Sequence, residues 1–294
     1  MRTGWNTIDG SRYFFYKYNP NGGSNGEMAT NTVIDGIKIG PDGRAMSARD
    51  TLNQIYGTNG VGLWNTNYLM SNGRKNALNT SIKAFENRGR TVGFVMVDIN
   101  SGQAITYHPT TGIYSASAIK GPYVMSLLHS GYSPNGQMYN AIKWSNNSDY
   151  EYIRRRYGSG VFADFLPVAG VSRNQASSYY TTTTCLDLSK MWLQGYQTLF
   201  GVNAQNSNWA RSTFQNVSNS QISASLSRSK TVYSRAGWIA EGGYYNVLTD
   251  GAIVTNGKNP FILSIMSTAP GIGETYQMRD LAYQLDMIHS EMVD

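Results

Sequence analysis

The chain has 294 residues, a formal net charge of +6 and a sequence pI ≈ 9.2. Hydrophobic residues make up 40% of it, which is enough to bury a sizeable core. The basic residues are scattered, and the densest run, Arg154–Arg156, is expected to be a solvated helix face, so we expect no nucleic-acid partner. No apolar run is long enough to cross a bilayer, and the sequence therefore predicts no transmembrane segment.

Sparse charge and abundant Gly, Asn, Ser, Thr and Tyr are typical of a secreted bacterial protein. A mild positive charge suits a protein that works beside anionic wall polymers. We therefore expect an extracellular, wall-associated protein whose signal peptide is absent from this sequence. The single cysteine, Cys185, cannot form an internal disulfide and is expected to be a small core residue rather than a catalytic thiol.

Residues 1–46 predict short β-hairpins, because Ile-Asp-Gly occurs at 8–10 and again at 34–36 among short alternating runs. With the aromatic run at 13–16 and Gly-x-Met at 26–28, this segment resembles the choline-binding type of cell-wall-binding repeat. The resemblance implies a cell-wall polymer as partner, with ligand contacts from Trp5, Tyr13, Phe14 and Phe15. Sequence alone leaves open that these aromatic side chains only hold the hairpins together.

The rest of the chain divides into a connector at 47–75, with a short helix at 48–56, and a globular domain at 76–294. In chain order the domain has a helix at 78–85, strands at 92–97 and 104–107, and an apolar helix at 118–128. Helical patterns at 137–143, 149–157, 161–166 and 183–199 precede strands at 231–238, 245–255 and 260–267 and a helix at 274–292. This order predicts an α+β fold: a five-stranded, largely antiparallel sheet flanked by two terminal helices, with an inserted all-α lobe.

A Ser-x-x-Lys motif opens the apolar helix. Ser117 and Lys120 are one helical turn apart, near the free N–H groups of a helix start. A serine hydroxyl needs a neighbouring base to take its proton, and a desolvated lysine near other cations has its pKa lowered enough to do so. A second match, Ser227–Lys230, lies in a polar stretch and is expected to be coincidental.

Two further elements carry polar groups suited to a cleft. Ser145-Asn146-Asn147 lies between two predicted helices, where the alternative is an ordinary helix-capping turn. Arg235-Ala236-Gly237 lies on the first strand of the C-terminal group, where the cation could bind a substrate carboxylate. Gly237 would let a substrate backbone lie against that strand.

In this order the three elements resemble the Ser-x-x-Lys, Ser-Asp-Asn and Lys-Thr-Gly motifs of class A β-lactamases and penicillin-binding proteins, over roughly residues 76–294. The threonine run before Cys185 and the closing helix add to the resemblance. It implies the β-lactamase/transpeptidase-like fold and acyl transfer through a serine. The implied roles are Ser117 as nucleophile, Lys120 as general base, Ser145 as proton relay, Asn147 as donor to the substrate amide, Arg235 in place of the motif lysine, and the N–H groups of Ser117 and Trp238 as oxyanion hole.

The departures from the family pattern narrow the expected activity. Ala236 removes a hydroxyl that would help to hold a carboxylate, and Asn146 replaces the motif aspartate. Residues 161–180 contain Asp164 but no glutamate, whereas class A β-lactamases use a glutamate there to activate the deacylating water. An acyl-enzyme would therefore turn over slowly or by another route.

The leading hypothesis is a secreted serine hydrolase that acylates Ser117 with a peptide or amide substrate, with peptidoglycan as the substrate source. The first alternative is a class A-like β-lactamase. The second is a catalytically weak wall-binding or interaction protein, which the altered Arg235-Ala236 pair favours. The three histidines lack metal-ligand spacing and no cofactor motif is present, so neither a metal nor a cofactor is expected.

Overall fold

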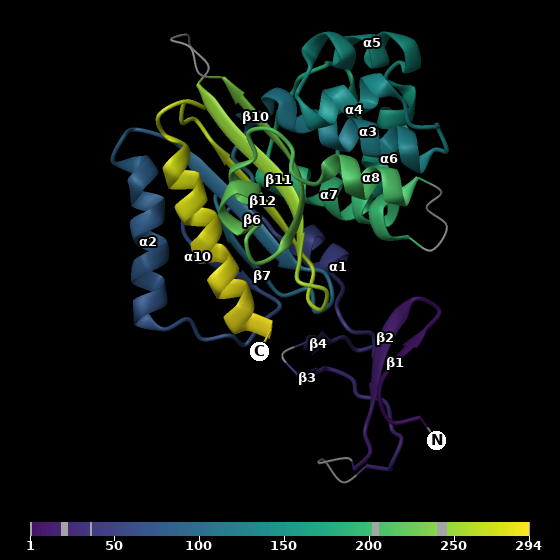
Figure 1. The fold of residues 1–294 in the computed structure, drawn as a ribbon. Helices are drawn as coiled ribbons and strands as arrows, with labels where there is room; N and C mark the ends of the chain where they lie inside the picture. The colour runs from purple at the N-terminus through teal and green to yellow at the C-terminus, as the bar shows by residue number, and fades with distance from the viewer. Residues whose placement is uncertain (1, 19–22, 36, 202–205, 240–245, 294) are drawn as a thin grey trace.

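The computed structural model describes residues 2–18, 23–35, 37–201, 206–239 and 246–293, and within them a six-stranded antiparallel sheet forms the centre of the molecule (Figure 1). The strands follow the order β10-β11-β12-β6-β7-β5. Their bounds are β5 Gly62–Trp64, β6 Val92–Asp98, β7 Ala104–Tyr107, β10 Thr231–Ile239, β11 Val247–Thr255 and β12 Phe261–Ser267.

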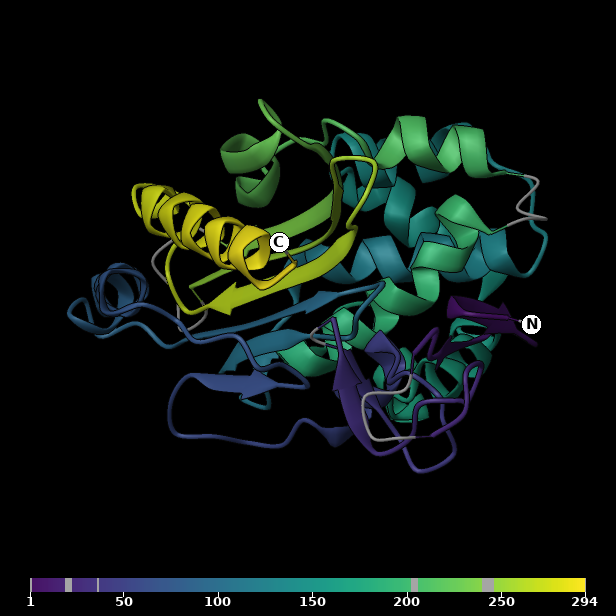
Figure 2. The same cartoon turned by 90° about the horizontal axis from the view of Figure 1, so that it is seen from below.

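Helices cover both faces of this sheet. On one face, α10 (Thr275–Val293) packs between α2 (Asn72–Glu86) and α9 (Gln221–Leu226) (Figure 1). The other face carries an all-α lobe, which Figure 2 shows beside the sheet. The helices of the lobe are α3 Lys120–His129, α4 Gly136–Lys143, α5 Asn147–Tyr157, α6 Gly160–Ala169, α7 Cys185–Phe200 and α8 Ser207–Phe214.

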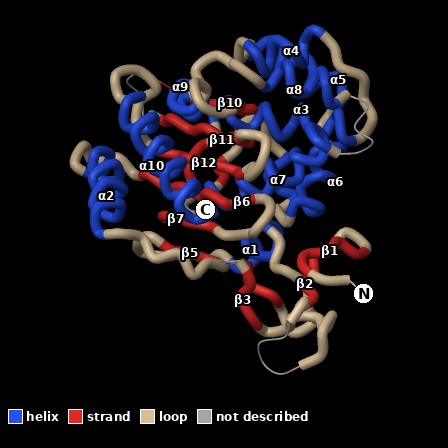
Figure 3. Tube along the Cα trace, turned by 60° about the horizontal axis from the view of Figure 1, so that its bottom comes forward, coloured by secondary structure: helices blue, strands red, loops and turns tan. Residues whose placement is uncertain are grey.

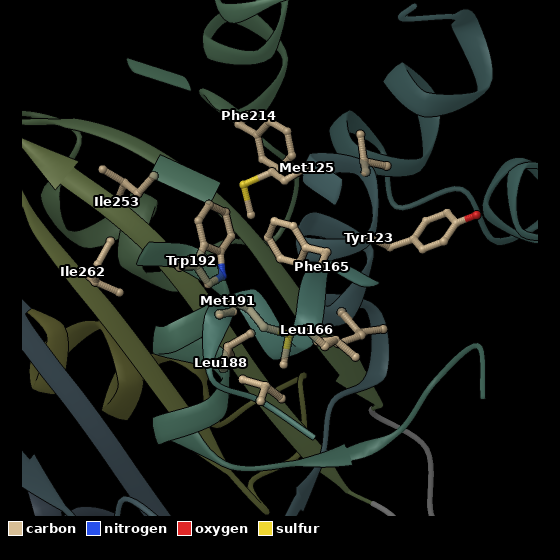
Figure 4. Packing of buried hydrophobic residues seen from close by; sticks show 14 of the residues in the cluster. Tyr123, Met125, Phe165, Leu166, Leu188, Met191, Trp192, Phe214, Ile253 and Ile262 are labelled. Carbon is tan, nitrogen blue, oxygen red and sulfur yellow. The ribbon is translucent and has the colours of Figure 1, made fainter. Parts of the chain in front are cut away.

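The lobe is joined to the sheet through α7. Trp192 of this helix is fully buried and lies against Gly251 of β11, where a Cβ would collide with the indole ring. Phe214 of α8 packs edge-on against the same indole, at 5.9 Å between ring centroids (Figure 4). Because helices cover both faces, β6 and β12 are buried at every position and show no polar alternation.

The predicted order of the longer elements agrees with the structure, and the differences concern short elements. The sheet gains a sixth strand, β5, from the predicted connector, because Gly62–Trp64 pairs with β7 and Trp64 Nε1 donates to Thr106 Oγ1 at 3.0 Å. A run of three residues is too short to show the alternation of apolar and polar side chains that identifies a strand in a sequence. The short helices α8 and α9 were not predicted, since at eight and six residues each spans only about two turns. The predicted strand start at 245 lies outside the described residues.

Two β-hairpins precede the domain in the described part of the chain (Figure 3). The first joins β1 (Gly4–Ile8) to β2 (Ser11–Phe15), and the second joins β3 (Thr32–Ile34) to β4 (Ile37–Ile39). Asp9 and Gly10 both have positive φ, as a two-residue hairpin turn requires. Gly36 of the second Ile-Asp-Gly lies outside the described residues, and the boundaries at 46 and 75 stay predictions. The connector begins with α1 (Ala48–Gln54). Ser47 and Asp50 form a capping box at the N-terminus of this helix.

Arg154 corrects the expectation that the Arg154–Arg156 run is solvated. Its side chain is 2% exposed, and its guanidinium lies 4.6 Å from the Tyr123 ring centroid and 4.8 Å from that of Tyr179. It donates to the carbonyls of Ala176 and Ser178 at 3.0 and 3.2 Å. Only the following arginines of the run are exposed. Arg154 therefore holds the segment after α6 against the lobe, because that segment supplies both carbonyls and the Tyr179 ring.

Replacing Arg154 by alanine should destabilise the protein by more than about 2 kcal/mol, because it empties a buried site and leaves two carbonyls without a donor. Arg155→Ala, on the same helix but exposed, is the matched control and should change stability by less than about 0.5 kcal/mol. Urea unfolding followed by circular dichroism measures both. Equal midpoints for the two variants would contradict this account of Arg154.

None of the helices in the described ranges combines the length and the apolar character that crossing a bilayer would require.

Candidate active site

Ser117 lies on a short turn between the sheet and the helical lobe. β8 (Ile113–Tyr114) pairs with β9 (Thr182–Thr183), and the 3-10 helix η1 (Ala116–Ile119) leads directly into α3. Ala116 has a φ of 43°, a left-handed conformation that costs a non-glycine residue roughly 1–3 kcal/mol. A strained residue just before the half-buried Ser117 indicates a backbone held in place by its surroundings.

The serine turn rests directly on strand β10. A Cβ on Gly237 would lie 2.5 Å from Ala118 N and 2.6 Å from Ser117 N, so only glycine permits this approach. The buried Thr249 of β11 bridges the contact, because its hydroxyl lies 2.9 Å from Ser115 O and 3.1 Å from Gly237 O. This packing brings Ser117 N–H and the peptide leading to Trp238 N–H into one neighbourhood, as an oxyanion hole requires.

Lys120 is fully buried, and its ammonium nitrogen faces the turn before α5. Nζ donates to Asn147 Oδ1 at 2.6 Å and to Ser145 O at 2.9 Å. Burial, assisted by the nearby Arg235 guanidinium, lowers the pKa of Lys120 to about 7. Asn146 O lies farther from Nζ, at 3.5 Å. A neutral amine has two N–H bonds, which the two nearer acceptors would use, and one lone pair left to take a proton. Lys120 is therefore suited to act as a base near neutral pH.

The Ser145-Asn146-Asn147 turn holds Lys120 chiefly through its main chain and one amide. Ser145 adopts a φ of 62°, which turns its carbonyl to Lys120. Asn146 caps α5, with its side chain accepting from Asp149 N at 2.9 Å, and this explains why an amide suffices where the family has an aspartate. Among the described residues, the hydroxyls of Ser117 and Ser145 form no hydrogen bond to Lys120. Such bonds are often long before substrate binds.

Tyr180 is a site residue that the sequence did not single out. Its hydroxyl donates to Asn147 Oδ1 at 3.2 Å, the atom that also receives Lys120 Nζ. Since two donors occupy this oxygen, the Asn147 NH₂ group is left to face away from Lys120 as a donor. The rings of Tyr180 and Tyr150 also lie 5.9 and 5.4 Å from Nζ. The only sequence signal was the position of Tyr180 just before the threonine run.

Arg235 is buried beneath the site rather than exposed in a cleft. Its side chain has no exposed surface and packs against Gly121 of α3, and Nη1 makes a long contact of 3.4 Å to Ser218 O. Nε and Nη2 have no hydrogen-bond partner among the described residues. Burial lowers the pKa of Arg235 to about 10, while the buried Asp250 opposes that shift. This placement favours an electrostatic effect on Lys120 over direct contact with a substrate carboxylate.

Residues 161–180, which cover most of α6 and the segment after it, supply no carboxylate to the site. Asp164 is exposed and pairs with Arg173 at 2.6 Å. Cys185 is buried, and burial raises the pKa of its thiol, which agrees with a core role. No group of three or more His, Cys, Asp or Glu side chains that could hold a metal ion occurs in the described part of the chain.

The four aromatic residues predicted to bind a ligand through the repeats do not share one face of their hairpin. Trp5 is paired with Phe14, and alternation along the strands places Tyr13 and Phe15 on the opposite face. Trp5 and Phe14 pack edge to face at 5.3 Å, and the Arg12 guanidinium lies 4.6 Å from the Trp5 ring. The cation-binding face of Trp5 is thus occupied by the protein's own arginine, which favours a packing role for this pair.

Residues 153–285 match the Beta-lactamase2 family model, described as the beta-lactamase enzyme family. The class A beta-lactamase from Mycobacterium abscessus is 13% identical, with a TM-score of 0.58 over 73% of this chain and 99% of that one. A beta-lactamase from Sphaerobacter thermophilus DSM 20745 is 14% identical, with a TM-score of 0.59 over 73% and 97%.

A point mutant of PBP-A, solved as an acyl-enzyme complex with penicillin G, is 14% identical, with a TM-score of 0.58 over 74% of this chain and 97% of that one. No curated protein sequence matches the chain. The mixed α/β fold is therefore that of class A beta-lactamases, as the sequence predicted. The family match, together with this fold, indicates a serine hydrolase of the beta-lactamase type.

Acylation of Ser117 should follow the protonation state of Lys120. Because the pKa of Lys120 is lowered to about 7, the ammonium form dominates below that pH and cannot take the serine proton. We expect the rate constant for a fluorophosphonate probe to rise about tenfold per pH unit up to about pH 7 and then to level off. A rate that stays flat from about pH 5 to about pH 8 would exclude Lys120 as the base.

Tyr180→Phe should slow acylation about two- to tenfold, because it removes one hydrogen bond to Asn147 but keeps the ring beside Lys120. Tyr179→Phe is the matched control, since the Tyr179 ring packs on Arg154 and its hydroxyl donates to no described residue. Rates of probe labelling at pH 8 distinguish the two. If both variants react like the wild type, the hydroxyl of Tyr180 does not position Asn147.

Proposed function

We propose that this protein is a secreted, wall-associated serine hydrolase that forms an acyl-enzyme on Ser117 from a peptide or amide substrate derived from peptidoglycan. The observation that carries the proposal is the arrangement of Lys120. It is buried one turn after Ser117, has a pKa of about 7, and is bound by Asn147 and Ser145. A lysine in that state has little use in a merely structural core, where it would be costly.

The proposed reaction follows from these positions. Lys120 takes the proton of Ser117, and Oγ forms a bond to the carbonyl carbon of the substrate amide. The N–H groups of Ser117 and Trp238 receive the developing oxyanion, and an interaction of this kind contributes roughly 3–4 kcal/mol. Ser145 passes a proton from Lys120 to the leaving nitrogen as the C–N bond breaks. Water then attacks the ester and releases the acid and Ser117.

Deacylation is the step for which the site is least equipped. The segment between α6 and β9 places Tyr180 beside Asn147, and burial raises the pKa of Tyr180 to about 12. A neutral phenol cannot act as a general base near pH 7. We therefore propose that the acyl-enzyme is long-lived, which disfavours the first alternative, a class A-like β-lactamase. Nitrocefin turnover measures that alternative directly.

The second alternative is a catalytically weak wall-binding protein. It is supported by Ala236 and by the burial of Arg235, which leave no exposed cation at the place of the motif lysine. Co-sedimentation of full-length Ser117→Ala with purified cell walls tests this alternative. Wall binding combined with no acylation of the wild-type protein would favour it over the hydrolase.

Ser117 should be labelled covalently by a fluorescent penicillin or by a fluorophosphonate, and Ser117→Ala should not. Ser227→Ala is the matched control, because Ser227 belongs to the second Ser-x-x-Lys match, at the C-terminus of α9 rather than in the site. It should be labelled like the wild type. Intact-mass spectrometry should show one adduct that persists for minutes or longer. Labelling by neither probe, with no adduct by mass, would falsify the proposed function.

A further inference from the structure

Glu151 presents an accessible carboxylate beside the candidate active site. It follows Asn147 by four residues in α5, so the two side chains share one face of the helix, with their Cβ atoms about 5–6 Å apart. Burial is the main cause of the pKa shifts of Lys120 and Tyr180, and the Glu151 charge acts on both, because it partly offsets the lowered pKa of Lys120 and adds to the raised pKa of Tyr180. The carboxylate therefore lies on the side of α5 that faces the site.

The present partner of Glu151 is a weak one. Arg155, one turn further along α5, lies 3.8 Å from Glu151, and the two side chains are 64% and 47% exposed. An exposed pair of this kind contributes little stability. No hydrogen bond joins the Glu151 side chain to another residue of the described ranges. Asp149, in contrast, accepts from Asn140 Nδ2 at 3.0 Å and lies in the first turn of the helix. Glu151 is therefore the carboxylate of α5 that is available to a ligand.

The cations of the site do not offer their charge to a substrate in the same way. Lys120 and Arg235 have no exposed surface, and Lys120 Nζ already donates to Asn147 and to the Ser145 carbonyl. A substrate that reaches Asn147 therefore meets an accessible negative charge one helical turn away, although the whole chain has a net charge of +6. That charge attracts a positive group on the substrate and repels a carboxylate placed there.

Asn147 fixes which part of a substrate lies beside Glu151. In the proposed reaction its NH₂ group donates to an amide of the acyl part, the part that stays on Ser117 after the leaving nitrogen departs. Glu151 lies about 5–6 Å from Asn147. Successive Cα atoms of a peptide are about 3.8 Å apart, so an amino group on the residue that Asn147 holds, or on the next one, can reach this carboxylate.

We propose that Glu151 is a specificity-determining residue, which selects acyl donors that carry a free ammonium group on the acyl side of the scissile amide. The substrate class is then a peptide with a basic amino side chain. This inference rests on the proposed acylation of Ser117 and adds the contact that chooses among peptides.

Two peptides that differ at a single amine test the proposal. They are Nα-acetyl-lysyl-D-alanyl-D-alanine and the same peptide with its side-chain amine acetylated. Intact-mass spectrometry at about pH 8 follows the adduct that each forms on Ser117. The peptide with the free amine should react about two- to fivefold faster, as one exposed ion pair implies, and salt at about 1 M should reduce this preference.

Glu151→Gln should abolish the preference. The ratio of the two rates is the readout, because loss of the carboxylate also shifts the pKa of Lys120, which changes both rates alike. Asp164→Asn is the matched control, since Asp164 is an exposed acid of the same lobe that pairs with Arg173. This variant should keep the preference of the wild type.

Three results would overturn the role of Glu151. They are equal rates for the two peptides with the wild type, a preference that survives in Glu151→Gln, or no adduct from either peptide on a protein whose Ser117 reacts with a fluorophosphonate. Failure of the fluorophosphonate and of a fluorescent penicillin to label Ser117 is a different result, because it removes the proposed acylation itself.

Discussion

The contact between the serine turn and Gly237 fixes the geometry on which the whole candidate site depends. No side chain separates the two backbones, so the turn has no room to shift toward β10. The Thr249 hydroxyl bridges Ser115 and Gly237 from behind. With η1 fixed, α3 starts in one direction, and Lys120 enters the lobe where the Ser145–Asn147 turn meets it. The strained φ of Ala116 is the local cost of this arrangement.

Aromatic rings and carbonyl oxygens are the direct contacts of the buried cations Arg154 and Lys120, and the Glu151 carboxylate only partly offsets the lowering of the Lys120 pKa by burial. Arg154 is surrounded by the rings of Tyr123, Tyr179 and Tyr150 and by carbonyl oxygens. Tyr150 also faces Lys120. A carboxylate in the place of these rings would lie near Lys120 and would raise its pKa through Coulomb attraction. Aromatic faces hold a guanidinium in place through the ring quadrupole rather than through a full negative charge, so a substantial neutral fraction of Lys120 remains near pH 7.

The sequence predicted the sheet, the lobe and the Ser-x-x-Lys element because each has a strong local signal, an apolar period or a motif at a helix start. It could not predict β5, whose three residues become a strand only by pairing with β7. It misplaced Arg154, since a run of arginines looks solvated until tyrosines distant in sequence surround one of them. The roles of Tyr180 and Thr249 depend on contacts 33 and 134 residues away, which no local pattern encodes.

Tyr180 bears on deacylation, because it lies in the segment that lacks a glutamate. The segment between α6 and β9 brings the Tyr180 phenol to Asn147, and residues 161–180 contain no glutamate that could activate water there. With a pKa of about 12, this hydroxyl stays protonated and donates to Asn147 throughout the physiological range. In the proposed reaction, the Tyr180 hydroxyl therefore positions Asn147 for acylation but supplies no general base for hydrolysis of the acyl-enzyme. If Ser117 is acylated as proposed, Lys120 is the candidate among the described site residues for activating the second nucleophile, and its pKa of about 7 would then govern both steps.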